Sequence, residues 1–474
     1  MKNIIEGEKK FESSRSIKNK ALRINLNKNI YGTFAEIGAG QETVRNFFRA
    51  GGASGTIAKT ISAYDKDFSD AIYGLEPQGR YVTEARLKDM LNFETQLIEE
   101  RISREKHPKK LFFSYANTVA TIDFAKKYKG HGWLGIKFQT QPKTDYNQIL
   151  IHVQFHENNA AHQQITLGLL GVNLIYGSFY YYDNPKKLLK SLYDHIDHDK
   201  IEIDAINFHG PSFEKVDNRL ISLELLRNGI TEAVMFGADG NNVLPASVLY
   251  KKNILTLRGS FRPVTRVNMN MYEESLNLFL QEKKVEEEDA VVIFEITLNN
   301  LKAEGDINEK DFLDRADLLC SLGHTVMISN FQEYYKVVEY FSQHTKRQMG
   351  LTMGVNTLTD IFNPEYYTNL SGGILEAFGK LFFKNLKIYL YPLKENDEIL
   401  NGEKIDIPEG MKELYQYFKD NKRVVDIENY EVEILDIHSR KVHQMIREGE
   451  EGWERMLPEK TARQIHEENL FQSI

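Results

Sequence analysis

Short apolar runs that alternate with amphipathic segments are the feature that most limits how this chain can fold. They recur between residues 110 and 393, and most runs have the length of a single strand. Residues 290–296 and 325–329 are apolar on both faces, as strands covered by helices on two sides must be. Strands that alternate with helices indicate β-α-β units. The pattern predicts an α/β fold built of mostly parallel sheet or sheets in β-α-β units.

The two ends of the chain depart from this pattern. After a polar leader, the apolar spacing from Gly32 to Arg104 is helical, with Thr83 as the expected N-cap of the last helix. An acidic segment, residues 282–289, is either a boundary between two α/β halves or an insertion loop. We expect four regions: a polar leader with a helical N-terminal region (1–108), a first α/β region (109–284), a second α/β region (285–395) and a helical C-terminal tail (396–474).

Composition narrows the classes of function. The 474 residues carry a net charge of −8 without a basic stripe, which disfavours binding to nucleic acid. The single cysteine, Cys320, excludes an intramolecular disulfide and fits a reducing compartment. No stretch approaches the ~18 consecutive apolar residues of a membrane span, and the polar N-terminus is not typical of a signal peptide. We expect a cytoplasmic protein with neither nucleic acid nor membrane as a partner.

A glycine-rich segment, residues 32–80, is a candidate anion-binding site. It contains Gly38, Gly40 and Lys59, and glycines beside cations can present backbone N–H groups to a phosphate. The segment is not a phosphate loop of the form G-x-x-x-x-G-K-[ST], because residues 53–60 have alanine at both glycine positions. We therefore expect Gly38, Gly40 and Lys59 to help bind the substrate.

Two other glycines of this segment have a simpler interpretation. Gly51 and Gly52 follow a helical pattern that ends at Ala50. Glycine is common just beyond the last residue of a helix. We interpret these two residues as the end of that helix.

Three arginines follow a predicted strand and are the sharpest candidates for substrate binding. Arg258, Arg262 and Arg266 lie within nine residues, separated by glycine, serine and proline. Guanidinium groups are permanently charged and bind phosphate or carboxylate through two hydrogen bonds. The alternative is that each arginine pairs with one of the 68 acidic side chains.

Two further residues at predicted strand ends are candidates for catalysis. His209 has an ordinary pKa near neutrality and is able to act as a general acid or base. Asp239 is suited to Mg²⁺ or a ribose hydroxyl, although Asp-Gly is also a common turn. His152 and His156 are about 13 Å apart if they lie on one strand, so a shared metal is not expected. The cofactor stays undefined, with Mg²⁺ expected only if the ligand is a nucleotide.

Five segments carry motifs specific to one family: residues 32–74, 131–139, 216–226, 258–265 and 371–382. With these motifs the chain resembles, over nearly its whole length, a bacterial protein family whose members carry automatic names such as nicotinate-nucleotide adenylyltransferase or TonB-box-like protein. The first name would require G-x-F-x-P-x-H-x-G-H near a first strand, and we expect no equivalent here. The second belongs to exported membrane receptors, which the missing signal peptide contradicts. The resemblance therefore implies a family without implying a chemistry or a set of site residues.

These patterns lead to two hypotheses about function. The first is a transferase-like enzyme, with nucleotidyl transfer as one form, that acts on a nucleotide or other phosphorylated small molecule. The second is a non-catalytic scaffold or regulatory protein in which the glycine-rich segment packs closely between the subunits of a homo-oligomer. The 24 tyrosines and 27 phenylalanines are compatible with buried interfaces.

Overall fold

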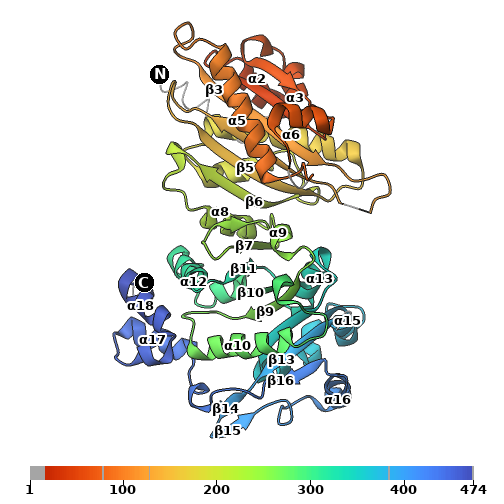
Figure 1. The fold of residues 1–474 in the computed structure, drawn as a ribbon, viewed down its shortest axis with the longest axis vertical. Helices are drawn as coiled ribbons and strands as arrows, with labels where there is room; N and C mark the ends of the chain where they lie inside the picture. The colour runs from red at the N-terminus through yellow and green to blue at the C-terminus, as the bar shows by residue number, and fades with distance from the viewer. Residues whose placement is uncertain (1–15, 77–78, 128, 383–384, 472–474) are drawn as a thin grey trace. The chain divides into compact units, whose positions relative to one another are not determined.

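A computed structural model describes residues 16–76, 79–127, 129–382 and 385–471 of the chain (Figure 1). The chain divides into two compact units, residues 1–231 and 232–474. The acidic segment 282–289 lies inside the second unit, where residues 287–289 form a 3-10 turn that leads into a strand. Each unit has its own sheet, and the two are described separately.

The first unit contains a six-stranded sheet in the order β2-β1-β3-β4-β5-β6. Its strands are β1 (Ile30–Ile37), β2 (Ile57–Ile61), β3 (Leu111–Ala120), β4 (His131–Phe138), β5 (Asn147–Phe155) and β6 (Ile201–His209). Only β2, β1 and β3 run parallel, whereas β3 to β6 are antiparallel. The prediction of mostly parallel sheet is therefore wrong for this unit.

Short connections explain two of the three antiparallel pairs, β3–β4 and β4–β5. Residues 121–130 join β3 to β4, and residues 139–146 join β4 to β5. A parallel pair needs a crossover of about a dozen residues or more, usually a helix, so these shorter links favour antiparallel neighbours.

The prediction of a helical region between Gly32 and Arg104 is wrong at β1 and β2. Six of the eight residues of β1 are buried, because β1 pairs with β2 and β3 and is covered on both faces. A side chain at Gly32 would lie 2.3 Å from the carbonyl oxygen of Phe113, so close pairing depends on this glycine. The apolar residues of this segment are spaced as in a helix, but pairing with neighbouring strands makes it a strand.

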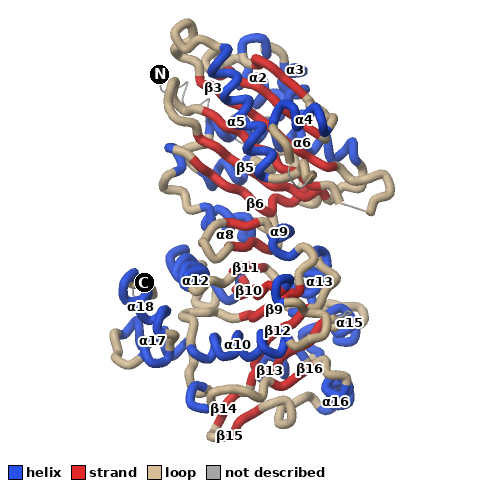
Figure 2. The backbone as a smooth tube through the Cα atoms, in the orientation of Figure 1, coloured by secondary structure: helices blue, strands red, loops and turns tan. Residues whose placement is uncertain are grey.

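The helices of the first unit lie on both faces of its sheet (Figure 2). They are α2 (Ile17–Asn25), α3 (Glu42–Ala50), α4 (Lys66–Tyr73), α5 (Glu84–Arg101), α6 (Ala160–Tyr180), α7 (Pro185–Ser191) and α8 (Asn218–Arg227). Thr83 caps α5 by accepting a hydrogen bond from Arg86 N, as predicted. The predicted end of a helix at Ala50 is also confirmed, since Gly51 follows α3 with φ of 85°. No described helix is long and apolar enough to cross a membrane.

The second unit has an eight-stranded sheet in the order β16-β13-β12-β9-β10-β11-β7-β8. The strands are β7 (Ala233–Phe236), β8 (Asn242–Val243), β9 (Asn253–Arg258), β10 (Ala290–Thr297), β11 (Thr325–Ser329), β12 (Met349–Gly354), β13 (Leu386–Tyr391) and β16 (Val424–Asp426), and a separate hairpin is formed by β14 (Leu393–Glu395) and β15 (Glu398–Leu400). From β16 to β11 every pair is parallel, which confirms the predicted sheet type here. The predicted helical tail is wrong at β15 and β16, and β16 extends the sheet.

Helices surround this parallel sheet and connect its strands (Figure 1). They are α9 (Pro245–Leu249), α10 (Arg266–Leu280), α11 (Leu298–Leu301), α12 (Glu309–Ser321), α13 (Tyr334–His344), α14 (Val355–Ile361), α15 (Gly373–Leu381), α16 (Lys412–Asp420), α17 (Ser439–Glu448) and α18 (Glu459–Glu468). Counted along the chain from β9, the six parallel strands have the order 3-2-1-4-5-6. That order places a topological switch point between β9 and β12. Ligands of such sheets bind outside the carboxyl ends of the strands at this point.

Candidate functional site

The segment that leaves β9 carries a motif that the sequence analysis did not expect. Gly259, Phe261 and Pro263 match the first three fixed positions of G-x-F-x-P-x-H-x-G-H and directly follow β9. The expectation of no equivalent is therefore wrong for this half of the pattern. Thr265 and Asn268 stand at its two histidine positions, so its second half is not preserved.

Thr265 and Asn268 have a structural role at the start of α10. The side-chain oxygen of Asn268 accepts a hydrogen bond from Thr265 N at 2.9 Å, and Thr265 Oγ accepts one from Asn268 N. This reciprocal arrangement is a capping box. Neither side chain titrates near neutral pH, so any charge at this end of the sheet must come from other residues.

A cavity of 620 Å³ lies beside this segment and is lined mainly by charged side chains. Ser260 and Arg262 come from the segment after β9, Glu304 from the α11–α12 turn, and Arg315 from α12. Helix α17 supplies the rest of the basic lining. With four arginines, one histidine and two glutamates, the lining is suited to an anion.

One face of α17 is directed at this cavity. The lining residues Arg440, His443, Gln444, Arg447 and Glu448 recur at the three- and four-residue spacing that places side chains on one side of a helix. Arg440 and Arg447 are exposed, and neither makes an ion pair or a hydrogen bond within the described part of the chain. Two guanidinium groups are therefore available to a ligand.

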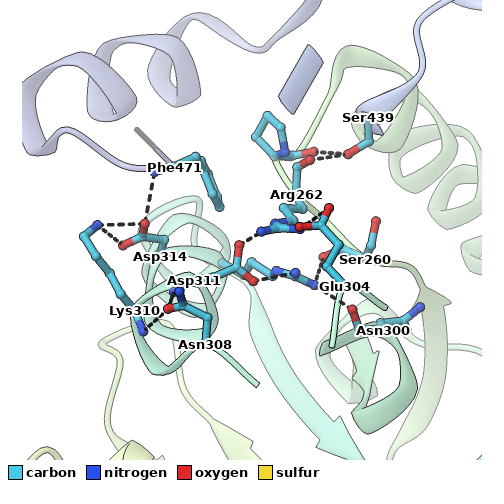
Figure 3. Close-up of polar contacts among 12 residues, drawn as sticks. Ser260, Arg262, Asn300, Glu304, Asn308, Lys310, Asp311, Asp314, Ser439 and Phe471 are labelled. Atoms are coloured by element: carbon cyan, nitrogen blue, oxygen red, sulfur yellow. Dashed lines mark hydrogen bonds and ion pairs between the residues drawn. The ribbon is translucent and has the colours of Figure 1, made fainter. Parts of the chain in front are cut away.

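Arg262 and Arg315 are instead held by a network of carboxylates (Figure 3). Asp311 lies 2.5 Å from Arg262 Nε and 2.5 Å from Arg315, so one carboxylate joins the two arginines. Glu304 contacts the other side of Arg262 at 2.8 Å. Arg315 also donates to the carbonyl oxygens of Ser260 and Asn300. The network fixes the guanidinium of Arg262 at the cavity wall.

The C-terminal helices are attached at one end to the segment after β9 and at the other end to α12 (Figure 3). Ser439 Oγ, at the first residue of α17, lies 2.8 Å from the carbonyl oxygen of Arg262 and 3.0 Å from that of Pro263. Beyond α18, the backbone N–H of Phe471 donates to Asp314 on α12 at 3.0 Å. These contacts hold the basic face of α17 next to the segment after β9.

His443 is the titratable group of this wall. Its side chain is 5% exposed, and its Nε2 has no hydrogen-bond partner among the described residues. Burial, with the nearby Arg262 charge as a second cause, lowers the pKa of His443 to about 4. His443 is therefore neutral at physiological pH.

The structure separates the three arginines predicted to bind substrate. Arg262 lines the cavity, whereas Arg258 forms a paired contact with the buried carboxylate of Glu295, with both nitrogen–oxygen distances at 2.9 Å. Arg266 forms an exposed ion pair with Glu431. The alternative of pairing with acidic side chains is thus observed for all three, and only Arg262 also faces the cavity.

Asp239 lies at a different edge of the sheet. Its strand β7 runs antiparallel to β11, so β7 ends at the edge opposite the carboxyl ends of the parallel strands. Asp239 occupies the exposed β7–β8 turn and accepts hydrogen bonds from Asn241. Asp239 is not among the residues that line the cavity, and its catalytic role stays a prediction.

In the first unit, the glycine-rich loop after β1 is occupied by a side chain of the protein itself. The buried carboxylate of Glu36 accepts hydrogen bonds from Thr43 N and Val44 N, amides in the first turn of α3 that have no carbonyl partner within the helix. Gly38 has φ of 90°, and a side chain there would lie 1.8 Å from the carbonyl oxygen of Val119. Glu36 therefore takes the amides that an external anion would use.

Glu36 gives the first unit a distinctive pH dependence. Burial raises its pKa to about 7 from 4.5, although the two amides and Asn117 act in the opposite direction. A raised carboxyl pKa contributes stability below about pH 4.5 that is lost as the pH rises through 7. We expect the urea midpoint of the first unit, followed by Trp133 fluorescence, to fall over this range and to fall less in Glu36→Gln. If the urea midpoint falls equally with pH in the natural protein and in Glu36→Gln, the raised pKa of Glu36 is contradicted.

Lys59 and His209 do not join Gly38 and Gly40 in one site. Lys59 pairs with the buried carboxylate of Glu94 at 2.7 Å. His209 ends β6, which runs antiparallel to β1 and lies four strands away, roughly 19 Å at ~4.8 Å per strand. Burial, with the nearby Lys88 charge, lowers the pKa of His209. Their roles in binding and catalysis stay predictions.

A buried polar cluster crosses the antiparallel strands of the first unit. His152 Nδ1 lies 2.5 Å from Asp204, and its Nε2 lies 3.2 Å from Nδ1 of His131. Burial, with His152 as a second cause, lowers the pKa of His131 to about 4. Within the described ranges, no three histidine, cysteine or acidic side chains gather as a metal site, so we interpret this cluster as a hydrogen-bonded part of the core.

Comparisons with known proteins give only distant similarities. No protein-family model and no curated protein matches the chain. Among solved structures, the competence/damage-inducible protein CihA of Agrobacterium tumefaciens is 12% identical, with a TM-score of 0.25, and the match covers 35% of this chain and 97% of that one. A nicotinic acid mononucleotide adenylyltransferase of Plasmodium falciparum is 14% identical, with a TM-score of 0.29 over 46% of this chain and 97% of that one. These similarities assign no family, and the site is argued from its own geometry.

Sequence reasoning missed the basic face of α17. The sequence places these residues only within an expected helical C-terminal tail, and the buried Val442 and Ile446 give α17 an ordinary apolar stripe. The signal on the opposite face was the pair Arg440 and Arg447, seven residues apart with His443 between them. Seven residues are close to two helical turns, so that spacing alone places both arginines on one side.

Proposed function

We propose that this chain is a transferase-like enzyme that binds a nucleotide or other phosphorylated small molecule in the cavity of its second unit. The observation that carries the proposal is the pair of arginines on α17, Arg440 and Arg447, which line the same cavity as Arg262 and have no carboxylate partner among the described residues. An exposed guanidinium pair at one cavity wall is well suited to phosphate oxygens.

The position of the cavity supports the same proposal. Ser260 and Arg262 belong to the segment that directly follows β9, next to the switch point of a 3-2-1-4-5-6 sheet. This segment is also the one that retains half of the nucleotidyltransferase pattern. The pattern lacks its histidines, so the proposal names a class of ligand and reaction and no particular substrate.

The chemistry available in the cavity is electrostatic. Fixed guanidinium groups stabilise the charge that develops on a phosphoryl group during its transfer, and phosphoryl transfer depends chiefly on such positioning and stabilisation. A nucleotide would bring Mg²⁺ bound through its phosphate oxygens. Arg440 and Arg447 would bind the phosphate chain, while Arg262 would contact the end nearest the sheet.

Calorimetric titration of the full chain with pyrophosphate, ATP and adenosine tests this proposal. Pyrophosphate and ATP are expected to bind, with an affinity that falls as the salt concentration rises, because the contacts are ionic. Adenosine is expected to bind at least tenfold more weakly than ATP. Binding of adenosine as tightly as ATP would contradict a site built for phosphate.

The scaffold hypothesis has one observation in its favour. Tyr64, Phe68 and Leu75, close together in sequence around α4, are 74%, 59% and 78% exposed. Exposed apolar groups of this size can mark a protein–protein contact. Native mass spectrometry distinguishes the hypotheses, since a large discrete oligomer that releases no phosphorylated molecule favours the scaffold.

A further inference from the structure

The carboxylate of Glu304 already occupies an anion position in the cavity. Glu304 lies 2.8 Å from Arg262 and lines the cavity with it. Figure 3 shows Glu304 and Asp311 on either side of the Arg262 guanidinium. One cation therefore has two carboxylate partners before any ligand binds.

The two carboxylates differ in how firmly they are held. The Asp311 side chain is 9% exposed and is shared with Arg315, so its removal would leave two buried guanidinium groups without their common partner. The Glu304 side chain is 55% exposed and sits in a surface turn in which Gly305 N donates to Lys302 O. An exposed ion pair contributes about 0–1 kcal/mol, so Glu304 is the partner that a ligand can replace at small cost.

The charges explain what such a replacement changes. Arg262, Arg315, Asp311 and Glu304 together have no net charge. When Glu304 leaves, the remaining three groups carry one positive charge directed at the cavity. A phosphate oxygen restores neutrality in the same position.

We propose that Glu304 is a built-in competitor that the phosphate of the ligand displaces from Arg262. The inference rests on the proposed function, and it makes Glu304 a residue that sets affinity. A small anion only exchanges one partner of Arg262 for another. A longer phosphate chain also reaches Arg440 and Arg447, which form no ion pair with Glu304, and these added contacts outweigh the loss of the Glu304 ion pair.

Pyrophosphate titrations of Glu304→Gln test this proposal, with Glu467→Gln as the matched control. Both variants remove one negative charge, but Glu467 is exposed on α18 and lies outside the cavity lining. Glu304→Gln is expected to bind pyrophosphate about fivefold more tightly than the natural protein, whereas Glu467→Gln should stay within about twofold. Circular dichroism checks that both variants are folded.

The outcomes separate this inference from the function beneath it. If the natural protein binds pyrophosphate and Glu304→Gln gains no more affinity than Glu467→Gln, displacement of Glu304 is wrong while the binding site stands. If neither the natural protein nor Glu304→Gln binds pyrophosphate, the proposed function and this inference are both overturned.

Discussion

Replacing Arg258 with alanine is expected to lower the free energy of unfolding of the second unit by about 3–5 kcal/mol. The Arg258 side chain is 9% exposed and Glu295 is fully buried, with two hydrogen bonds between them. Without Arg258, the Ser329 hydroxyl is the one side-chain donor left to Glu295 among the described residues. A buried carboxylate without its cation is costly, so Arg258→Ala should lower the free energy of unfolding more than most substitutions of surface residues do.

Arg266→Ala is the control for this prediction. Arg266 and Glu431 are 45% and 53% exposed, and an exposed pair contributes at most about 1 kcal/mol. Urea unfolding in a Trp133→Phe background leaves Trp453, which belongs to the second unit and is 4% exposed, as the reporter. A stable Arg258→Ala protein with weakened pyrophosphate binding would restore the first interpretation of Arg258 as a substrate contact.

The second unit could largely be predicted from its sequence, and the first could not. In the second unit, strands such as β10 and β11 are apolar and separated by helices, and that alternation leads directly to parallel sheet. In the first unit, β1 has a spacing that fits a helix as well as a strand, and only its pairing with β2 and β3 decides between them. Strand order depends on such distant partners, so local periodicity does not contain it.

The candidate site was predicted in part for the same reason. Arg262 stood out because it follows a strand, and the structure places it at the cavity. Arg440 and Arg447 are about 180 residues further along the chain, and tertiary contacts such as those of Ser439 and Phe471 hold their helix at the cavity. Gly38 is required by the fold, because the backbone there passes close to the carbonyl of Val119. It does not form an anion site, since Glu36 accepts the hydrogen bonds of the α3 amides.

Replacing both Arg440 and Arg447 with alanine is expected to weaken pyrophosphate binding by about 100-fold. Each hydrogen bond to a charged group is worth about 1.5–3 kcal/mol, and losing the lower value twice corresponds to roughly two powers of ten in affinity. Because both side chains are exposed and make no ion pair with a described residue, the fold should keep its stability. Unfolding midpoints within about 0.5 M urea of the natural protein would confirm this.

Titration of pyrophosphate into the full-length Arg440→Ala/Arg447→Ala protein tests the central claim most directly. Arg463→Ala is the matched control, because Arg463 is an exposed arginine on the neighbouring α18 outside the cavity lining. The account predicts a loss of about 100-fold in the double variant and less than about threefold in the control. Binding at the natural affinity in the double variant would place the phosphate elsewhere and contradict the account.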